Sequence, residues 1–168
     1  MRVYVPLTLP ALAQAHRSDE LAAGTVDAYA VTPGLREWHP SGHDEELEYA
    51  ALGHAAESSL HLLAADPDAV RRRVVVALDV APQDLAVPGD AAAADAARGE
   101  VRITGPVRLS EAAAVHVDAE EAAARIAAAV SALAAAERDE AGARQAVEDA
   151  EEHELLWFAT QEIPALLA

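Results

Sequence analysis

The sequence predicts an α+β fold in a single domain, residues 1–168, with a mixed β-sheet of about five short strands packed against about four helices. Three observations support this prediction. Short apolar runs of strand length are interspersed with longer amphipathic segments. A chain of 168 residues is long enough to bury a core of its own. Apolar residues make up 52% of the chain, so that core needs no disulfide, and there is no Cys to form one.

The charge of the chain is strongly unbalanced. All 12 basic residues are Arg, against 29 Asp plus Glu, which gives a formal net charge of −17. Phosphates would be repelled by this field, so we expect no nucleic-acid partner. The absence of Cys excludes thiol catalysis, Fe–S clusters and zinc ribbons.

No targeting or membrane-spanning segment is expected. Pro6, Thr8 and Pro10 interrupt the apolar start, which therefore does not resemble a signal peptide. The Ala-rich run at 126–136 is about half the ~20 residues that a membrane span requires. We therefore expect a cytoplasmic protein without a membrane partner.

Short apolar runs bounded by turn residues predict the strands. They are expected at 3–5, 26–32, 72–80, 101–103 and 114–117. The run at 72–80 (RRVVVALDV) is apolar over most of its length, which is typical of a central strand. Residues 86–100 show no periodicity and are expected to form a flexible connection.

Amphipathic spacing and end signals predict the helices, which are expected at about 7–21, 44–65, 118–136 and 143–163, with a short helical turn at 35–40. In the second, Tyr49, Leu52, Ala56, Leu60 and Leu63 form one apolar stripe. Acidic residues at 44–46 suit the start of that helix, because the helix dipole favours carboxylates there. Asp118 is expected to cap the third helix, with Glu121 as its capping-box partner.

Six segments spread over most of the chain carry a resemblance to a known family. They are MRVYVPLTL at 1–9, AVTPGLREW at 30–38, DEELEYAA at 44–51, RRVVVALDV at 72–80, AVHVD at 114–118 and HELLWFATQEIP at 153–164. Through them the chain resembles an uncharacterised family of short actinobacterial proteins, a domain of unknown function. The resemblance implies an intracellular actinobacterial protein and implies no activity.

A second resemblance concerns the order of elements. VYVPLT, AYAVT, ALDVAPQDL and GPVRLSEAAAVHV follow one another as in ADP-ribosyltransferase-type folds, which this part of the chain resembles. Such enzymes use a His on the first strand, a Tyr on the second and a Glu late in the sheet. Tyr29 matches the second position, the first strand has no His, and the late strand offers His116. The resemblance therefore implies a degenerate site.

Two clusters of residues resemble metal or phosphate sites. His39 and His43 flank a turn next to an acidic helix start, and we interpret them as parts of a solvated loop. The run at 71–73 (RRR) is interpreted as a charged strand end that pairs with helix carboxylates. Ser58 and Ser59 have no basic neighbour that would activate a nucleophile. We therefore expect no metal and no cofactor.

The predicted last helix provides the candidate site. Its wheel places Leu155, Leu156, Ala159 and Ile163 on a core face and Trp157 on the opposite side. Glu162 would lie in the final turn, where the dipole disfavours a carboxylate, so we expect it to form a buried pair with Arg36.

The alternative to this pair is a polar pocket. The candidate ligand-binding residues of the two interpretations together are Arg36, Trp38, Glu48, Glu154, Trp157, Gln161 and Glu162.

Two functions stay open at this point. The first is a non-enzymatic protein that works by association, with a homodimer as the expected form. The second is an enzyme acting on a small molecule or nucleotide, with its site between residues 36–49 and the last helix. The sequence identifies neither a ligand nor a reaction.

Overall fold

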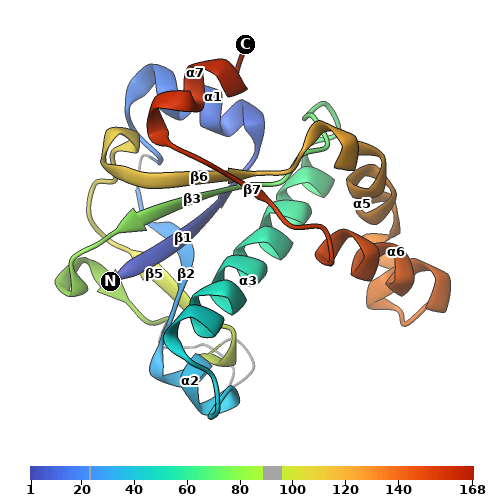
Figure 1. The fold of residues 1–168 in the computed structure, drawn as a ribbon, viewed down its shortest axis with the longest axis horizontal. Helices are drawn as coiled ribbons and strands as arrows, with labels where there is room; N and C mark the ends of the chain where they lie inside the picture. Colours follow the sequence, from blue (N-terminus) through green and yellow to red (C-terminus); the bar gives the residue numbers. More distant parts are fainter. Residues whose placement is uncertain (23, 89–95) are drawn as a thin grey trace.

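A computed structural model describes residues 1–22, 24–88 and 96–168, and over these residues the chain forms one antiparallel sheet of seven strands with six helices (Figure 1). The strands are β1 (Arg2–Leu7), β2 (Val26–Ala30), β3 (Val74–Asp79), β4 (Leu85–Ala86), β5 (Glu100–Ile103), β6 (Ala112–Val117) and β7 (Leu156–Phe158). The helices are α1 (Leu9–Ser18), α2 (Pro33–Trp38), α3 (Asp44–Ala65), α5 (Ala123–Glu137), α6 (Ala141–Glu151) and α7 (Ile163–Leu166). Among them, none combines the length and hydropathy that a bilayer crossing requires.

The α+β class is confirmed, whereas the predicted counts are too low and the sheet is not mixed. Its strand order is β4-β5-β2-β1-β3-β6-β7, and each neighbouring pair is antiparallel. β1 and β3 pair over six residues, from Arg2 opposite Asp79 to Leu7 opposite Val74. β3 therefore lies in the interior of the sheet, as its continuous apolar run predicts. Of the connection predicted at 86–100, residues 89–95 lie outside the described residues.

The two faces of the sheet are covered by different helices. On one face, Val3 and Val5 of β1 pack in a cluster with Leu12 of α1 and Ile163 of α7. On the other face, Tyr4 packs in a cluster with Ala51 and other small residues of α3. Small side chains let the α3 backbone approach the sheet closely, which is one use of the 44 Ala residues in the chain.

The second half of α3 leaves the sheet and packs against α5 and α6, at the right of Figure 1. Leu60 and Leu63 of α3 form a third buried cluster with Ile126 and Leu133 of α5 and with Ala150 of α6. The stripe predicted on this helix is therefore divided between two sets of partners. Its first member, Tyr49, belongs to neither and is exposed.

The helix predicted at 143–163 is wrong in its second half. α6 ends at Glu151, and Leu156–Phe158 form edge strand β7, with Trp157 opposite His116. A short apolar run such as LLWF suits either a helix or a strand, and the free edge of β6 decides between them.

Asp118 does not cap a helix, so that prediction is also wrong. α5 begins at Ala123 after a 3-10 turn at Glu120–Ala122, and no side chain caps either element. Asp118 instead binds Arg73, which follows from their positions at the adjoining ends of β6 and β3.

The Arg73–Asp118 ion pair is almost wholly buried, with side chains 3% and 0% exposed. The Arg73 backbone N–H donates to Oδ2 of Asp118 at 2.7 Å, and its Nε and Nη2 donate to Oδ2 and Oδ1 at 2.9 Å each. Nη2 also donates to the backbone carbonyl of His153 at 2.7 Å. One side chain thus joins the start of β3, the end of β6 and the segment that leads into β7.

The other two residues of the arginine run bind carbonyls rather than the predicted carboxylates. Nη1 of Arg71 donates to the carbonyls of Leu63 and Asp66 at the end of α3. Nε of Arg72 donates to the carbonyl of Asp118 at 2.8 Å. Carbonyls at the end of a helix are favourable partners for a cation, because the helix dipole is negative there.

We predict that Asp118→Asn lowers the free energy of unfolding by about 3–5 kcal/mol, because Arg73 would keep a buried charge without a counterion. Asp44→Asn is the control, since Asp44 forms an exposed pair with Arg36 and its loss should cost less than about 1 kcal/mol. Urea denaturation at pH 7 measures both. Equal effects of the two substitutions would contradict this account of the buried pair.

Candidate functional site

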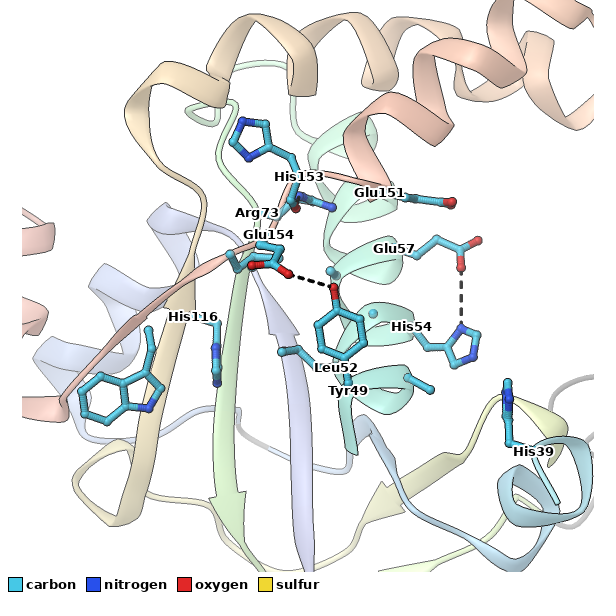
Figure 2. Close-up of a pocket in the computed structure, with 15 residues that line it drawn as sticks. His39, Tyr49, Leu52, His54, Glu57, Arg73, His116, Glu151, His153 and Glu154 are labelled. Atoms are coloured by element: carbon cyan, nitrogen blue, oxygen red, sulfur yellow. Dashed lines mark hydrogen bonds and ion pairs between the residues drawn. The ribbon is translucent and has the colours of Figure 1, made fainter. Parts of the chain in front are cut away.

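A groove of about 510 Å³ runs along the exposed side of α3 and the neighbouring edge of the sheet (Figure 2). α3, β6 and the segment from Glu151 to Trp157 supply most of its walls. Arg73 and His39 also line it. The groove exists because α6 packs on the C-terminal half of α3. The chain that leads from α6 to β7 then passes beside the N-terminal half of α3 without covering it.

Two exposed aromatic side chains line this groove. Tyr49 of α3 is 60% exposed and Trp157 of β7 is 62% exposed. The chain has only six aromatic residues in all. The Tyr49 hydroxyl donates to Oε1 of Glu154 across the groove at 3.4 Å, as Figure 2 shows. Large aromatic side chains left in water beside a hollow are typical of a binding surface.

The groove also contains apolar groups and one half-buried imidazole. Leu52 and Leu155 are partly buried and pack against the cluster beneath α3. The His116 ring meets the Tyr4 ring edge to face, with centroids 6.5 Å apart. Burial lowers the pKa of His116, and the charge of Arg2 lowers it further, so the imidazole is neutral at pH 7.

Carboxylates give the groove a negative charge. Burial raises the pKa of Glu151, and the nearby Glu57 and Glu148 raise it further. Within the described parts of the chain, neither Glu151 nor Glu154 forms an ion pair. Arg73 also lines the groove, but its charge is compensated by Asp118.

A second polar cluster, of which His54 and Glu57 also line the groove, joins α3 to neighbouring strands. Nδ1 of His54 lies 3.9 Å from Oε2 of Glu57, and Nη2 of Arg98 lies 2.7 Å from the same oxygen. Together these two groups lower the pKa of Glu57 to about 2, although burial alone would raise it. The hydroxyls of Tyr29 and Ser58 are hydrogen-bonded at 2.5 Å. These contacts join α3 to β2 and to the residues before β5.

The structure brings two of the seven candidate residues, Glu154 and Trp157, into this groove. Glu48 lies on α3 close enough to Arg2 and Tyr4 to influence both pKa values. Arg36 and Trp38 belong to α2, and Trp38 lines a smaller hollow there. Gln161 and Glu162 belong to a 3-10 turn beyond β7.

The predicted Arg36–Glu162 pair is wrong. Arg36 binds Asp44 at 2.8 Å on the surface, and Glu162 accepts a hydrogen bond from the Ala159 backbone N–H at 2.7 Å. Because a new turn begins at Thr160, Glu162 lies near a helical start, where a carboxylate is favourable.

Sequence reasoning missed several residues of the groove, chiefly Tyr49, Gly53, His116, Glu151 and Leu155. Tyr49 is part of the stripe that the sequence predicts as buried, whereas His116 and Leu155 reach the groove through the pairing of β6 with β7. The sequence holds no periodic signal for them, because the run at 155–158 is apolar throughout and suits a helix as well as a strand.

The described residues show no group of three or more His, Asp and Glu side chains that could hold a metal ion. The hydroxyls near the groove are used structurally: Ser59 donates to the Leu7 carbonyl at 2.6 Å and accepts from the Val74 N–H at 3.0 Å. Tyr29, the residue that matches ADP-ribosyltransferases, is buried and hydrogen-bonded to Ser58. This arrangement gives that resemblance no further support.

Comparison with known proteins identifies a family. The profile of the Family of unknown function (DUF6912) matches residues 1–167, so the chain belongs to that family. The resemblance to a domain of unknown function is thereby confirmed. No curated protein and no solved structure matches the chain.

We predict that Glu57→Gln destabilises the fold by about 1–2 kcal/mol at pH 7, after allowance for solvent screening of a half-buried group. Because the folded-state pKa lies below the ordinary value of 4.5, this contribution is complete above pH 4.5 and disappears as the pH falls towards 2.

Urea midpoints of wild type and variant, measured from pH 7 down to pH 2.5, should therefore converge. Glu45→Gln is the control, since Glu45 is exposed and forms no ion pair within the described residues, and it should change stability by less than about 0.5 kcal/mol. A constant difference at all pH values would contradict the role given to the Glu57 charge.

Proposed function

We propose that this chain is a non-enzymatic binding module, and that the groove beside α3 docks a short segment of another protein. The observation that carries the proposal is the pair of exposed aromatic side chains, Tyr49 and Trp157, beside the partly buried Leu52 and Leu155. Aromatic residues around a hollow with apolar walls are the usual centre of a protein interface.

The state of the nearby hydroxyls supports binding rather than covalent catalysis. The Ser58 and Ser59 hydroxyls are occupied by Tyr29 and by the backbone of β1 and β3. A catalytic hydroxyl needs a base within hydrogen-bond reach. In this arrangement the hydroxyls hold the fold together.

The charge of the chain supports a partner other than a second copy, although a homodimer was expected from the sequence. Two copies docked groove to groove would bring Glu151 and Glu154 of each copy together. With a net charge of −17 on each chain, such a contact is opposed by repulsion. A self-associated form is therefore an outcome that would overturn the proposal.

Gly53 offers a way to close the groove without disturbing the fold. It lies on the groove wall in the middle of α3, and a Cβ placed there would meet nothing within 4 Å. Gly142 in α6 has the same freedom but lies outside the groove. Gly53→Phe and Gly142→Phe are thus a matched pair.

We predict that phage selection with random 12-residue peptides on the wild-type chain enriches peptides whose binding is lost on Gly53→Phe and kept on Gly142→Phe. Circular dichroism and sedimentation of all three proteins verify that they are folded and monomeric. Selected peptides that still bind the Gly53→Phe variant would overturn the proposal. A wild-type dimer that the Gly53→Phe substitution dissociates would overturn it as well.

A further inference from the structure

We propose that the groove recognises a cationic side chain of the docking segment, with an Arg guanidinium held at the Glu154 carboxylate beside the Tyr49 ring. This inference rests on the binding function proposed above and names the chemistry that the groove selects. Three properties of the groove support it.

The first property is uncompensated negative charge. Glu154 receives only the Tyr49 hydroxyl, at 3.4 Å, which leaves most of its hydrogen-bonding capacity unused within the described residues. Glu151 adds a second carboxylate in the same groove. The cation that lines the groove, Arg73, already binds both carboxylate oxygens of Asp118 and the His153 carbonyl. A ligand's cation would supply the missing counter-charge.

The second property is an exposed aromatic ring, that of Tyr49, in contact with Glu154. A guanidinium stacks on the faces of Trp and Tyr, and the attraction is worth about 0.5–2 kcal/mol depending on exposure. Tyr49 is held towards Glu154 by its hydroxyl, so one ring and one carboxylate belong to the same subsite. An anionic group at this position would be repelled by the Glu154 carboxylate instead.

The third property is apolar surface beside the charge. Leu52 and Leu155 can cover the methylene stem of a long basic side chain while its charged end reaches Glu154. The neighbouring His116 is neutral, because burial lowers its pKa, and so it adds no positive charge to repel the ligand. Together the three properties suit Arg or Lys, and the flat ring of Tyr49 favours Arg.

The test uses peptides that differ in charge and little in shape. Acetyl-Leu-Arg-Leu-amide and its citrulline counterpart are titrated into the ¹⁵N-labelled chain, and the two Trp indole N–H resonances are followed by NMR. Trp157 reports on the groove, whereas Trp38 does not line it and serves as an internal control. We expect the Arg peptide to move the Trp157 resonance and to bind about tenfold more tightly than the citrulline peptide.

Two variants locate the charge that is responsible. Glu154→Gln keeps an oxygen that can accept from Tyr49 and should reduce the Arg preference to about twofold or less. Glu45→Gln removes one exposed carboxylate at the start of α3, outside the groove, and should leave the preference for the Arg peptide unchanged. An equal effect of both variants would mean that only the general acidity of the chain attracts the peptide, and would overturn the inference.

The outcomes also separate this inference from the function on which it rests. If the citrulline peptide binds as tightly as the Arg peptide and Gly53→Phe blocks both, the groove is a docking site without cation selectivity. If neither peptide moves the Trp157 resonance, the cation subsite is refuted, and the peptide selection alone decides whether the groove binds proteins. A shift of Trp38 in place of Trp157 would likewise overturn the inference.

Discussion

The geometry of the candidate site depends on one buried interaction, the pair between Arg73 and Asp118. A buried charge is tolerated when its hydrogen-bonding positions are filled, and Asp118 receives three such bonds from Arg73. The same guanidinium binds the His153 carbonyl and so fixes the chain just before β7. Because β7 pairs with β6 over only three residues, this anchor sets where Glu154 and Trp157 lie.

The course of α3 explains why a groove remains beside that anchor. Its first half packs on the sheet through small residues, and its second half packs on α5 and α6. One helix therefore packs against two layers, and the side that faces neither layer carries Tyr49 and Gly53. The returning chain then passes this uncovered side on its way to the sheet edge (Figure 1).

Local signals predicted elements well, and the errors lie where distant segments decide. The bounds of α3, 44–65, agree with those expected from its spacing and its acidic start. β7 could not be assigned from periodicity alone, since LLWF suits a helix as well as a strand, and its place depends on β6 about 40 residues earlier. The incorrect Arg36–Glu162 pair followed from that error. The predicted helix placed Glu162 in its last turn, where a carboxylate needs a cation, whereas in the structure Glu162 lies at the start of a new turn. Glu154 and Trp157, candidates from a helical wheel, do line the groove, but the wheel gave them the wrong neighbours, so the residues around them were missed.

Gly53 is a residue of the groove that the requirements of folding do not explain. Glycine in a helix interior costs about 1 kcal/mol relative to alanine, and the surroundings of Gly53 leave room for a side chain. Gly99 differs, since its positive φ and the nearby Ala30 carbonyl require glycine. Gly142 also has room, but it lies in the first turn of α6, outside the helix interior. Packing therefore does not explain Gly53, whereas the ligand proposed for the groove would approach the α3 backbone there, between Tyr49 and Glu57.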